Sequence, residues 1–483
     1  MTQIALRQLD QWRWLVPRKS DQRMRTDGLI FADETLIADL RDDLTLKQVA
    51  NVATLPGIVG KSLAMPDAHA GYGFPIGGVA AFDMDEGVIS PGGVGYDINC
   101  GVRLLRTDLS VPDVQGKLED LAQAIFNAVP SGVGKSGAFN LSTTDLRAVL
   151  SDGARWPVKQ GYGTEHDLAH TEAEGRLPGA DPDALSSRAF KRGSPQLATL
   201  GAGNHFLEIQ AVDTIEDPDI ARAFGIDEVG QVCVMIHTGS RGLGHQVCDD
   251  AIGQMLKAAQ KYGIELADRQ LACAPVNSPE GQHYFTAMAA AANYAWANRQ
   301  TITHQVRSSF EKILRAGPGK LGMRQVYDVA HNIAKFEDHQ VGGHTKRLCV
   351  HRKGATRAFG PGHPEVPAAY RAHGQPVLVP GDMGTGSHLL VGTQTAMEQT
   401  WGSTCHGAGR RMSRSAAIRA QHGSQVYDKL TAQGIVVRSA GKKTLAEEAP
   451  EAYKNVDQVV AVCHGADISR RVARLRPLAV VKG

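Results

Sequence analysis

The segment from residue 66 to residue 103 constrains the fold more than any other, because glycine interrupts it every few residues. It begins PDAHAGYGFPIGG, continues through a short apolar stretch, and ends GGVGYDINCGVR. Glycine adopts backbone conformations that other residues avoid, and its missing side chain lets a second segment or a ligand come close. The pattern therefore predicts short strands that alternate with tight loops.

Elements of both kinds are expected elsewhere, without a regular alternation of strand and helix. Two segments, 34–54 and 281–316, predict helices, and the second stops at Gly-Pro-Gly. The polar residues 141–193 predict a region of short helices across the surface. Buried strands are expected at 205–210, 231–236, 347–352 and 375–380. From the sequence alone, the fold is a mixture of α and β.

The composition excludes several classes of protein. The chain is 42% hydrophobic and 21% charged, as in soluble globular proteins. A net charge of +2 excludes a global basic field, so contact with nucleic acid would need a local patch. Seven cysteines, an odd number in a long chain, do not indicate the disulfide framework of a secreted protein. The N-terminus has no signal-peptide pattern and no apolar run reaches about 18 residues, so we expect a cytoplasmic protein without a membrane segment.

Asp97 and Cys100 lie three positions apart in one glycine-rich loop, and no Cys-x-x-Cys motif occurs in the chain. His205, His237 and His331 each stand beside Gly, Asn or Ser at an expected end of a strand or helix. A single histidine in such a setting is more often structural. Five ligands, however, are too many for one tetrahedral structural zinc and suit two neighbouring divalent ions that share the thiolate. By softness, thiolate and imidazole favour zinc or cobalt over manganese.

His406 lies in CHGAGRR, where glycines let a large ligand approach the backbone. The arginines that follow, Arg410, Arg411 and Arg414, suit bidentate contacts with phosphate. A neutral imidazole beside a metal-bound phosphate can act as a nucleophile, while a further metal ligand or a structural histidine stays an alternative. Ser240 and Arg241 follow His237 in HTGSRGLGH, which could cradle an anion ahead of the next helix.

Residues 129–136, VPSGVGKS, come close to a phosphate-binding P-loop. Val129 stands where the motif requires its first glycine, and no clear strand precedes it. We interpret this segment as a turn before the polar region.

Eight motifs together resemble the RtcB family of RNA ligases, in order and over nearly the whole chain: MPDAHAGYGFPIGG, GGVGYDINCGVR, GNHFLE, HTGSRGLGH, YDVAHN, PGDMGTGS, CHGAGR and the terminal VVKG. The resemblance implies an α+β fold. It implies one complex mixed domain over residues 1–483, with largely antiparallel sheets and surrounding helices around a binuclear metal cleft. The polar residues 141–193 would lie within that domain.

The resemblance also implies a GTP- and manganese-dependent ligase. Such an enzyme joins RNA ending in a 3′-phosphate or 2′,3′-cyclic phosphate to RNA beginning with a 5′-hydroxyl, in RNA repair or tRNA splicing. In the family a histidine is first guanylated, and GMP then passes to the RNA 3′-phosphate. The 5′-hydroxyl attacks that activated end, and a cyclic phosphate is hydrolysed beforehand. The resemblance leaves open the natural RNA and the need for an archease-type activator.

The family's functional residues map onto this chain by motif. Asp97, Cys100 and His205 would bind one Mn²⁺, and Cys100 would bridge to a second held by His237 and His331. His406 takes the place of the guanylated histidine. The positions matched to catalysis or to RNA phosphate contact are Asp67, Arg241, Arg410 and Arg414. Those matched to the guanylate pocket are Asn204, His205, Phe206, Leu207, Glu208, His331, Asn332, Pro380, Gly381, Asp382, Met383, Ser387, His406, Gly407, Ala408, Gly409 and Lys482.

Two positions depart from the family pattern. Asp382 stands where many relatives have serine, and a carboxylate there would repel phosphate unless it faced the guanine edge, a lysine or a metal. Ala198 stands where glycine is common, which predicts a mild change in packing. Two other functions are alternatives: a binuclear-metal phosphodiesterase or nuclease using water, and a regulatory nucleotide-binding protein without chemistry. The glycines around His406 and the terminal lysine favour the ligase over the hydrolase, and the intact set of candidate ligands disfavours an inactive protein.

Overall fold

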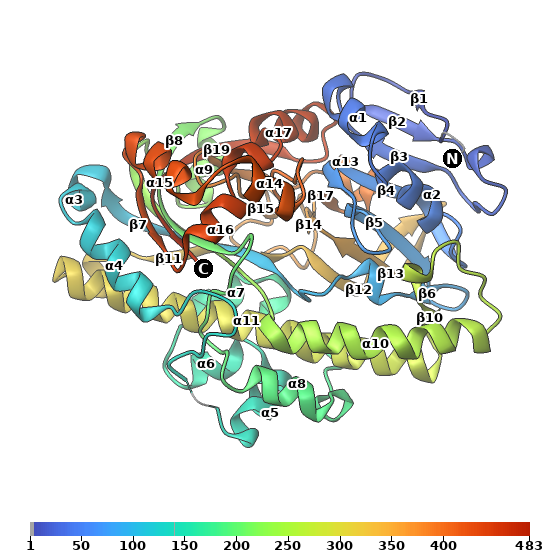
Figure 1. Cartoon of the computed structure of the whole chain (residues 1–483), viewed down its shortest axis with the longest axis horizontal. Coiled ribbons are helices and arrows are strands. Elements are labelled where there is room, and N and C mark those ends of the chain that lie inside the picture. The colour runs from blue at the N-terminus through green and yellow to red at the C-terminus, as the bar shows by residue number, and fades with distance from the viewer. Residues whose placement is uncertain (1–3, 140) are drawn as a thin grey trace.

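Two large, mostly antiparallel sheets dominate the computed structural model, which describes residues 4–139 and 141–483 (Figure 1). The first has, in spatial order, β1 (Arg7–Gln8), β2 (Arg13–Val16), β3 (Gly28–Phe31), β4 (Ile58–His69), β5 (Ile76–Asp83), β13 (His344–Lys353) and β12 (Asn332–Val341). The second has β11 (Arg324–Ala330), β7 (Gly101–Ser110), β9 (Gln231–Thr238), β8 (Phe206–Ile215), β19 (Arg470–Lys482), β16 (Ser387–Val391) and β15 (Pro376–Val379), with β18 (Val436–Ser439) beside β19.

Only two neighbouring pairs in these sheets, β3 with β4 and β18 with β19, run parallel. Two short ribbons complete the strands described: β6 (Val88–Ile89) with β10 (Ala274–Pro275), and β14 (Ala355–Arg357) with β17 (Ser403–Cys405). The predicted α+β class with largely antiparallel sheets is confirmed. The strands predicted at 205–210, 231–236, 347–352 and 375–380 correspond to β8, β9, β13 and β15.

The longest helix, α11 (Pro279–Leu314), confirms the helix expected at 281–316 (Figure 1). The Ser278 side chain caps it by accepting a hydrogen bond from the Gly281 amide, and the left-handed backbone of Arg315 ends it. Its alanine-rich middle, residues 287–297, is buried, since small side chains let other elements pack against every side of the helix. It packs along α10 (Arg241–Lys261) and α4 (Leu118–Ala128).

One expected helix is wrong in its extent. Residues 34–54 form two helices, α1 (Glu34–Arg41) and α2 (Thr45–Val52). The Asp43 carboxylate accepts hydrogen bonds from the Thr45 amide at 2.6 Å and hydroxyl at 2.9 Å. This local bonding competes with the helical ladder and starts a new helix.

The polar stretch 141–193 forms four short helices. Three of them lie against α10 and α11 on the lower side of Figure 1: α5 (Thr143–Asp152), α6 (Arg155–Lys159) and α8 (Ser187–Gly193). The fourth, α7 (Glu165–Ala169), packs against β11. Residues 129–136 form a turn-rich loop in which Ser131 makes an isolated bridge to Gly201. The next helix begins only at Thr143, whereas a P-loop leads directly into its helix.

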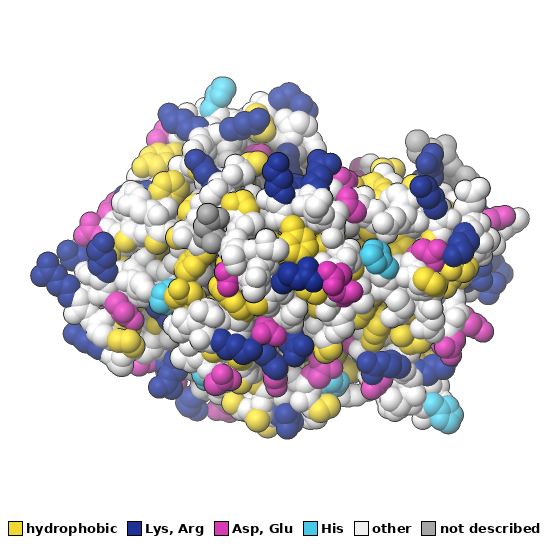
Figure 2. Space-filling view, turned by 90° about the horizontal axis from the view of Figure 1, so that it is seen from below, with side chains coloured by type: hydrophobic (Ala, Val, Ile, Leu, Met, Phe, Trp, Pro, Cys, Tyr) yellow, Lys and Arg dark blue, Asp and Glu magenta, His cyan; other side chains and the backbone are white. Residues whose placement is uncertain are grey.

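The remaining helices cover the sheets and their ends. They are α3 (Val111–Gln115), α9 (Pro218–Ala223), α12 (Pro318–Leu321), α13 (Gln394–Thr400), α14 (Arg414–Ala420), α15 (Gly423–Ala432), α16 (Lys442–Glu447) and α17 (Val456–Gly465). Seen from below, Lys and Arg side chains are spread over the surface with Asp and Glu among them (Figure 2). Among the described residues, no helix is both long and apolar enough to cross a membrane.

Candidate metal and nucleotide site

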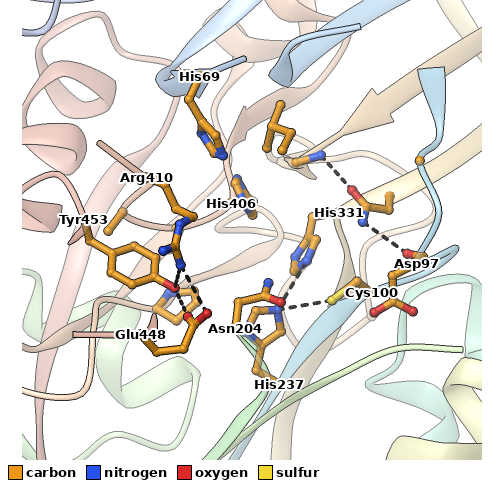
Figure 3. A pocket seen from close by; sticks show the side chains of 18 of the residues that line it. His69, Asp97, Cys100, Asn204, His237, His331, His406, Arg410, Glu448 and Tyr453 are labelled. Carbon is orange, nitrogen blue, oxygen red and sulfur yellow. Dashed lines mark hydrogen bonds and ion pairs between the residues drawn. The ribbon is translucent and has the colours of Figure 1, made fainter. Parts of the chain in front are cut away.

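A cavity of about 370 Å³ is lined by residues from both large sheets, and its volume is typical of sites for small molecules (Figure 3). It gathers the end of β4, the loop before β7, the start of β8, the end of β9 and the junction of β11 with β12. The loop between β15 and β16, the segment after β17 and the end of β19 close it. Segments more than 400 residues apart in the chain therefore meet at one place.

Asp97, Cys100 and His205 form a group of three possible metal ligands. An oxygen of Asp97 lies 2.8 Å from Nε2 of His205, and Sγ of Cys100 lies 3.3 Å from the same nitrogen. The Cys100 amide donates to the Asp97 carbonyl at 2.9 Å, and the Asn332 side chain donates to that carbonyl at 3.1 Å. The loop is thus folded so that both of its ligand side chains reach one histidine.

Cys100, His237 and His331 form a second group, which shares Cys100 with the first. Nε2 of His237 lies 3.3 Å from Sγ of Cys100 and 3.3 Å from Nε2 of His331. In each group the ligand atoms lie within 4.8 Å of one another. Oxygen, nitrogen and sulfur ligands converging in two groups around one sulfur fit a pair of divalent ions with a bridging thiolate.

Burial sets the protonation of these ligands. It lowers the pKa of His205, His237 and His331, so the imidazoles are neutral at pH 7, as metal ligands must be. It raises the pKa of the Cys100 thiol well above its usual value. Burial opposes ionisation of Asp97, but the neighbouring His205 and Arg241 outweigh it and hold the pKa of that carboxyl low.

Arg299 of α11 holds the backbone on which these ligands stand. Its Nη1 donates to the carbonyl oxygens of Asn99 and Thr238, each at 2.8 Å. Its Nε and Nη2 bind the two oxygens of Asp328 at 2.8 and 2.9 Å. Asn99 precedes Cys100 and Thr238 follows His237, so one fully buried guanidinium ties both ligand segments together.

His406 lies beside His331, with ring centres 4.9 Å apart (Figure 3). Its Nδ1 lies 2.5 Å from Oδ2 of Asp67, which also accepts the amides of His406 at 2.9 Å and Gly407 at 3.2 Å. Asp67 is fully buried in β4. The contact holds the ring proton on Nδ1, which leaves Nε2 as the nitrogen with a free electron pair.

The wall of the cavity contains most residues predicted for the guanylate: Asn204, Phe206, His331, Asn332, Pro380, Gly381, Asp382, Met383, His406, Gly407, Ala408, Gly409 and Lys482. Arg410 and Arg414 line it too. Arg410 pairs with Glu448 at 3.1 Å, and Arg414 pairs with Glu447 at 2.9 Å. Arg241 lies behind the first metal group, with Nη1 2.9 Å from Nδ1 of His205.

Four predicted guanylate residues lie outside the cavity wall: His205, already described in the first metal group, and Leu207, Glu208 and Ser387. Leu207 is the clear exception, because side chains alternate along β8 and its side chain packs in the hydrophobic core on the other face. Glu208 points to the cavity side but stands behind the wall, where burial raises its pKa to about 8 against the opposing effects of Gln210 and Lys482. Ser387 accepts a hydrogen bond from Gln210 at 3.0 Å and from the Gly381 amide at 3.4 Å.

The carboxylate of Asp382 is bound within its own loop. Its Oδ1 accepts the amides of Gly384 at 2.8 Å and Thr385 at 3.1 Å, and its Oδ2 accepts the Thr385 hydroxyl at 2.9 Å. The carboxylate is therefore used by its own loop, as in an Asx turn.

Several residues of the cavity wall were not predicted from the sequence. Tyr72 and Tyr96 stand inside two of the family motifs, and Tyr96 directly precedes the candidate ligand Asp97, which is a signal in the sequence. Glu448 follows α16 and Tyr453 follows a short 3-10 turn, and neither stands in a motif that signals a site. The unpredicted lining residues with polar or aromatic side chains are His69, Tyr72, Tyr96, His245, Lys353, Glu448 and Tyr453.

Comparison with known proteins gives one consistent result. The family model described as "tRNA-splicing ligase RtcB" matches residues 48–483. The chain is similar to proteins described as tRNA-splicing ligase RtcB from three archaea. It is 56% identical over 480 residues to that of Thermococcus kodakarensis and 58% over 478 residues to that of Archaeoglobus fulgidus, covering 99% of each chain. It is 50% identical over 485 residues to that of Pyrobaculum aerophilum, covering 100% of both chains.

Proposed function

Because the chain belongs to the tRNA-splicing ligase RtcB family and is therefore an RNA ligase, we propose that it joins a 3′-phosphate or 2′,3′-cyclic phosphate end to a 5′-hydroxyl end. The reaction would require GTP and two Mn²⁺ ions. The main support for this proposal is the position of His406, whose Nδ1 is bound to Asp67 and whose ring lies beside the two groups of metal ligands.

The donor set fits two divalent ions. Asp97, Cys100 and His205 would hold one, and Cys100, His237 and His331 the other. Bound there, the ions would supply positive charge to the phosphates that react. The neutral imidazoles and the low pKa of Asp97 prepare two of the three ligand types for this role, whereas Cys100 must lose its proton as metal binds.

In the first step, Nε2 of His406 attacks the α-phosphorus of GTP. The N–P bond forms, the bond between the α-phosphorus and the bridging oxygen breaks, and pyrophosphate leaves. Asp67 stabilises the positive charge that develops on the ring by accepting the Nδ1 hydrogen at 2.5 Å. The two backbone amides that also bind Asp67 fix this carboxylate in place.

In the second step, an oxygen of the RNA 3′-phosphate attacks the guanylate phosphorus, and the bond to Nε2 breaks. In the third, the 5′-hydroxyl oxygen attacks the RNA phosphorus, GMP leaves, and the hydroxyl proton passes to solvent. Arg241, Arg410 and Arg414 would bind phosphate oxygens, which requires Arg410 and Arg414 to exchange their present carboxylate partners. A cyclic phosphate would first be opened by water.

The guanylate would occupy the half of the cavity near Lys482. Burial lowers the pKa of this lysine, while Glu448 and Glu208 oppose that effect. Its Nζ lies 5.7 Å from the centre of the Phe206 ring. A cation at this position, at the end of β19, suits the base or phosphate of a nucleotide.

The measurement that tests the proposal is the intact mass after incubation with GTP and Mn²⁺. We expect the wild-type protein to gain one GMP and the His406→Ala variant to gain none. If the wild-type protein binds metal but gains no GMP, the hydrolase becomes the better assignment. Cleavage of RNA with a 2′,3′-cyclic phosphate in the absence of GTP would then support that second function.

We also propose a biological role and a location for the protein. The description of the family supports a role in tRNA splicing. We propose RNA repair as the alternative setting and an archease-type activator as a partner. A cytoplasmic location is supported by the cysteines, all seven of which are free and buried.

A further inference from the structure

Three aromatic rings form a row along one wall of the cavity and take no part in the chemistry described above. The rings of Tyr72 and Tyr96 meet edge to face, with centres 5.6 Å apart and planes at 68°. The rings of Tyr96 and His245 are stacked, with centres 5.3 Å apart and planes at 29°. All three line the cavity, His245 is exposed, and both tyrosines are only half-buried. Solvent therefore reaches a continuous aromatic surface.

The row extends the site away from the nucleotide half. Tyr96 directly precedes the candidate ligand Asp97. Figure 3 shows Asp97 on one side of His331 and His406, with Glu448 and Tyr453 on the other. A ligand lying on the row would thus be next to the metal ligands without occupying the space assigned to the guanylate.

The backbone around the row is held in place. Nζ of Lys353 donates to the carbonyl oxygen of Tyr72 and, at 3.1 Å each, to those of Phe74 and Gly92. Gly95 packs over the Lys353 side chain. His245 lies in the second turn of α10. Rings on fixed supports lose little conformational freedom when a ligand stacks on them.

The charge near the row suits a nucleic acid. Burial, together with Arg192 and Arg241, lowers the pKa of His245, while Asp97 and Asp249 oppose this effect, and the ring is neutral at pH 7. A neutral ring stacks on any base, and the same two arginines place positive charge near the row, which attracts the phosphates of a nucleic acid.

We propose that Tyr72, Tyr96 and His245 form a stacking platform for the nucleobase of an RNA end at the reaction centre. This inference rests on the proposed function, because it assigns a subsite to the RNA substrate of that reaction. Proteins commonly bind the unpaired bases of single-stranded RNA on aromatic side chains. The base could belong to the 3′-phosphate strand or to the 5′-hydroxyl strand, and the experiment below separates the two.

The test places 2-aminopurine, whose fluorescence falls when it stacks, at the last nucleotide of one RNA end and then of the other. We expect wild-type protein with bound RNA to quench the probe at one of the two ends, which identifies the strand. Tyr96→Phe should quench it equally, because the ring is kept, whereas Tyr96→Leu should not. Tyr262→Leu is the matched control, since this tyrosine lies at the far end of α10, roughly 25 Å from His245.

A ligation measurement separates stacking from an indirect effect on Asp97. Replacing the terminal base with an abasic nucleotide should raise the KM for that RNA about tenfold or more in the wild-type protein. In Tyr96→Leu the same replacement should change KM little, because the stacking partner is already absent. An equal loss in both proteins would overturn the proposal, as would bound RNA that quenches at neither end, or RNA that does not bind.

The two proposals can fail separately. Wild-type protein that gains GMP and ligates RNA, but shows neither quenching nor the effect of the abasic nucleotide, refutes the platform and keeps the ligase mechanism. Protein that quenches the terminal probe but gains no GMP refutes the histidine mechanism and keeps the platform.

Discussion

At the scale of single residues, the carboxylate of Asp382 belongs to its own turn, with three hydrogen bonds from Gly384 and Thr385. We predict that Asp382→Asn, which keeps the acceptor Oδ1, forms the GMP adduct within about threefold of the wild-type rate. Asp382→Ala removes every acceptor and should lower the free energy of unfolding by about 1–3 kcal/mol. Adduct formation followed by mass and urea denaturation measure the two effects. A tenfold slower adduct in Asp382→Asn would mean that the charge itself serves the nucleotide.

Ala198 is the second departure from the family pattern, and its backbone explains why glycine is common there. Its φ is +64°, a left-handed conformation that costs a residue with a Cβ about 1–2 kcal/mol. Replacing Ala198 with glycine removes this cost, but part of the benefit is offset because glycine loses more conformational freedom on folding. We therefore predict that Ala198→Gly raises the free energy of unfolding by about 0.5–1 kcal/mol.

The control for Ala198→Gly is Ala189→Gly, also fully buried but inside α8. There the same change should lower the free energy of unfolding by about 1 kcal/mol. Both values come from urea denaturation at one temperature. The same sign for the two variants would contradict the argument from backbone conformation.

Glu208 should make the stability of the nucleotide-free protein depend on pH. Burial raises its pKa from 4.5 to about 8, so the folded protein holds a proton that the unfolded chain releases above pH 4.5. Its contribution to stability is therefore complete below about pH 4.5 and lost as the pH rises towards 8. In Glu208→Gln this loss disappears. The free energy of unfolding of the variant, relative to that of the wild-type protein, should therefore increase by roughly a few kcal/mol between pH 5 and pH 9.

Denaturation at several pH values measures this difference for Glu208→Gln. Glu216→Gln provides the control, because this carboxylate lies just beyond β8 and is about one-third exposed. The free energy of unfolding of Glu216→Gln should follow that of the wild-type protein at every pH. Parallel curves for all three proteins would show that Glu208 ionises normally in the folded state.

At the scale of elements, α11 supports the metal ligands from below through Arg299. We predict that Arg299→Lys, which keeps the charge but loses the branched geometry, lowers Mn²⁺ affinity about 10- to 100-fold. The free energy of unfolding should also fall by about 1–3 kcal/mol, because the carbonyls of Asn99 and Thr238 lose donors. Calorimetric titration with Mn²⁺ and thermal unfolding provide the two readouts.

Arg307→Lys is the matched control on the same helix. Arg307 makes two 2.7 Å contacts with Asp167 and touches no candidate metal ligand. The Arg307→Lys variant should have a lower free energy of unfolding but the same affinity for Mn²⁺ as the wild-type protein. An equal fall in affinity for both variants would mean that any damage to α11 disturbs the site, and that Arg299 has no particular role.

The helices and strands differ in how well they could be predicted from the sequence. Hydrophobic pattern and end signals were sufficient for α11, because its long alanine-rich segment and its Gly-Pro-Gly stop are local. They failed at residues 34–54, where the side chain of Asp43 breaks one apparent helix into two. Motif matching treated 204–208 as one block, yet strand alternation turns Leu207 away from the cavity.

At the scale of the whole molecule, the pairing of distant strands could not be derived from local patterns. Lys482 meets the rest of the site only because β19 lies next to β8, and Phe206 is its direct partner in that ladder. Asp67 and His406 meet across 339 positions of sequence. Resemblance to a family supplied these residues, whereas the aromatic row and the Arg299 contacts emerged only from the three-dimensional arrangement.

The charge of the whole molecule gives the last prediction. Basic and acidic side chains are mixed over the face shown in Figure 2, and the net charge is +2. The surface as a whole therefore does not attract RNA or release the counterions bound to its phosphates. RNA affinity should instead depend on the few arginines at the cavity. With about three phosphate contacts, the logarithm of the binding constant should fall with that of salt concentration with a slope of about −2.

One arginine at the cavity allows this slope to be tested. Arg414 is 62% exposed and pairs with Glu447, so it is available to a phosphate. Arg414→Gln should make the slope shallower by about 0.7, because one contact is lost. Arg222→Gln, which removes an equally exposed arginine from α9 outside the cavity wall, should leave the slope unchanged. Fluorescence titration of single-stranded RNA at several salt concentrations gives both slopes. A wild-type slope near zero would remove phosphate binding by these arginines from the mechanism, and a slope far steeper than −2 would indicate that much more of the surface contacts RNA.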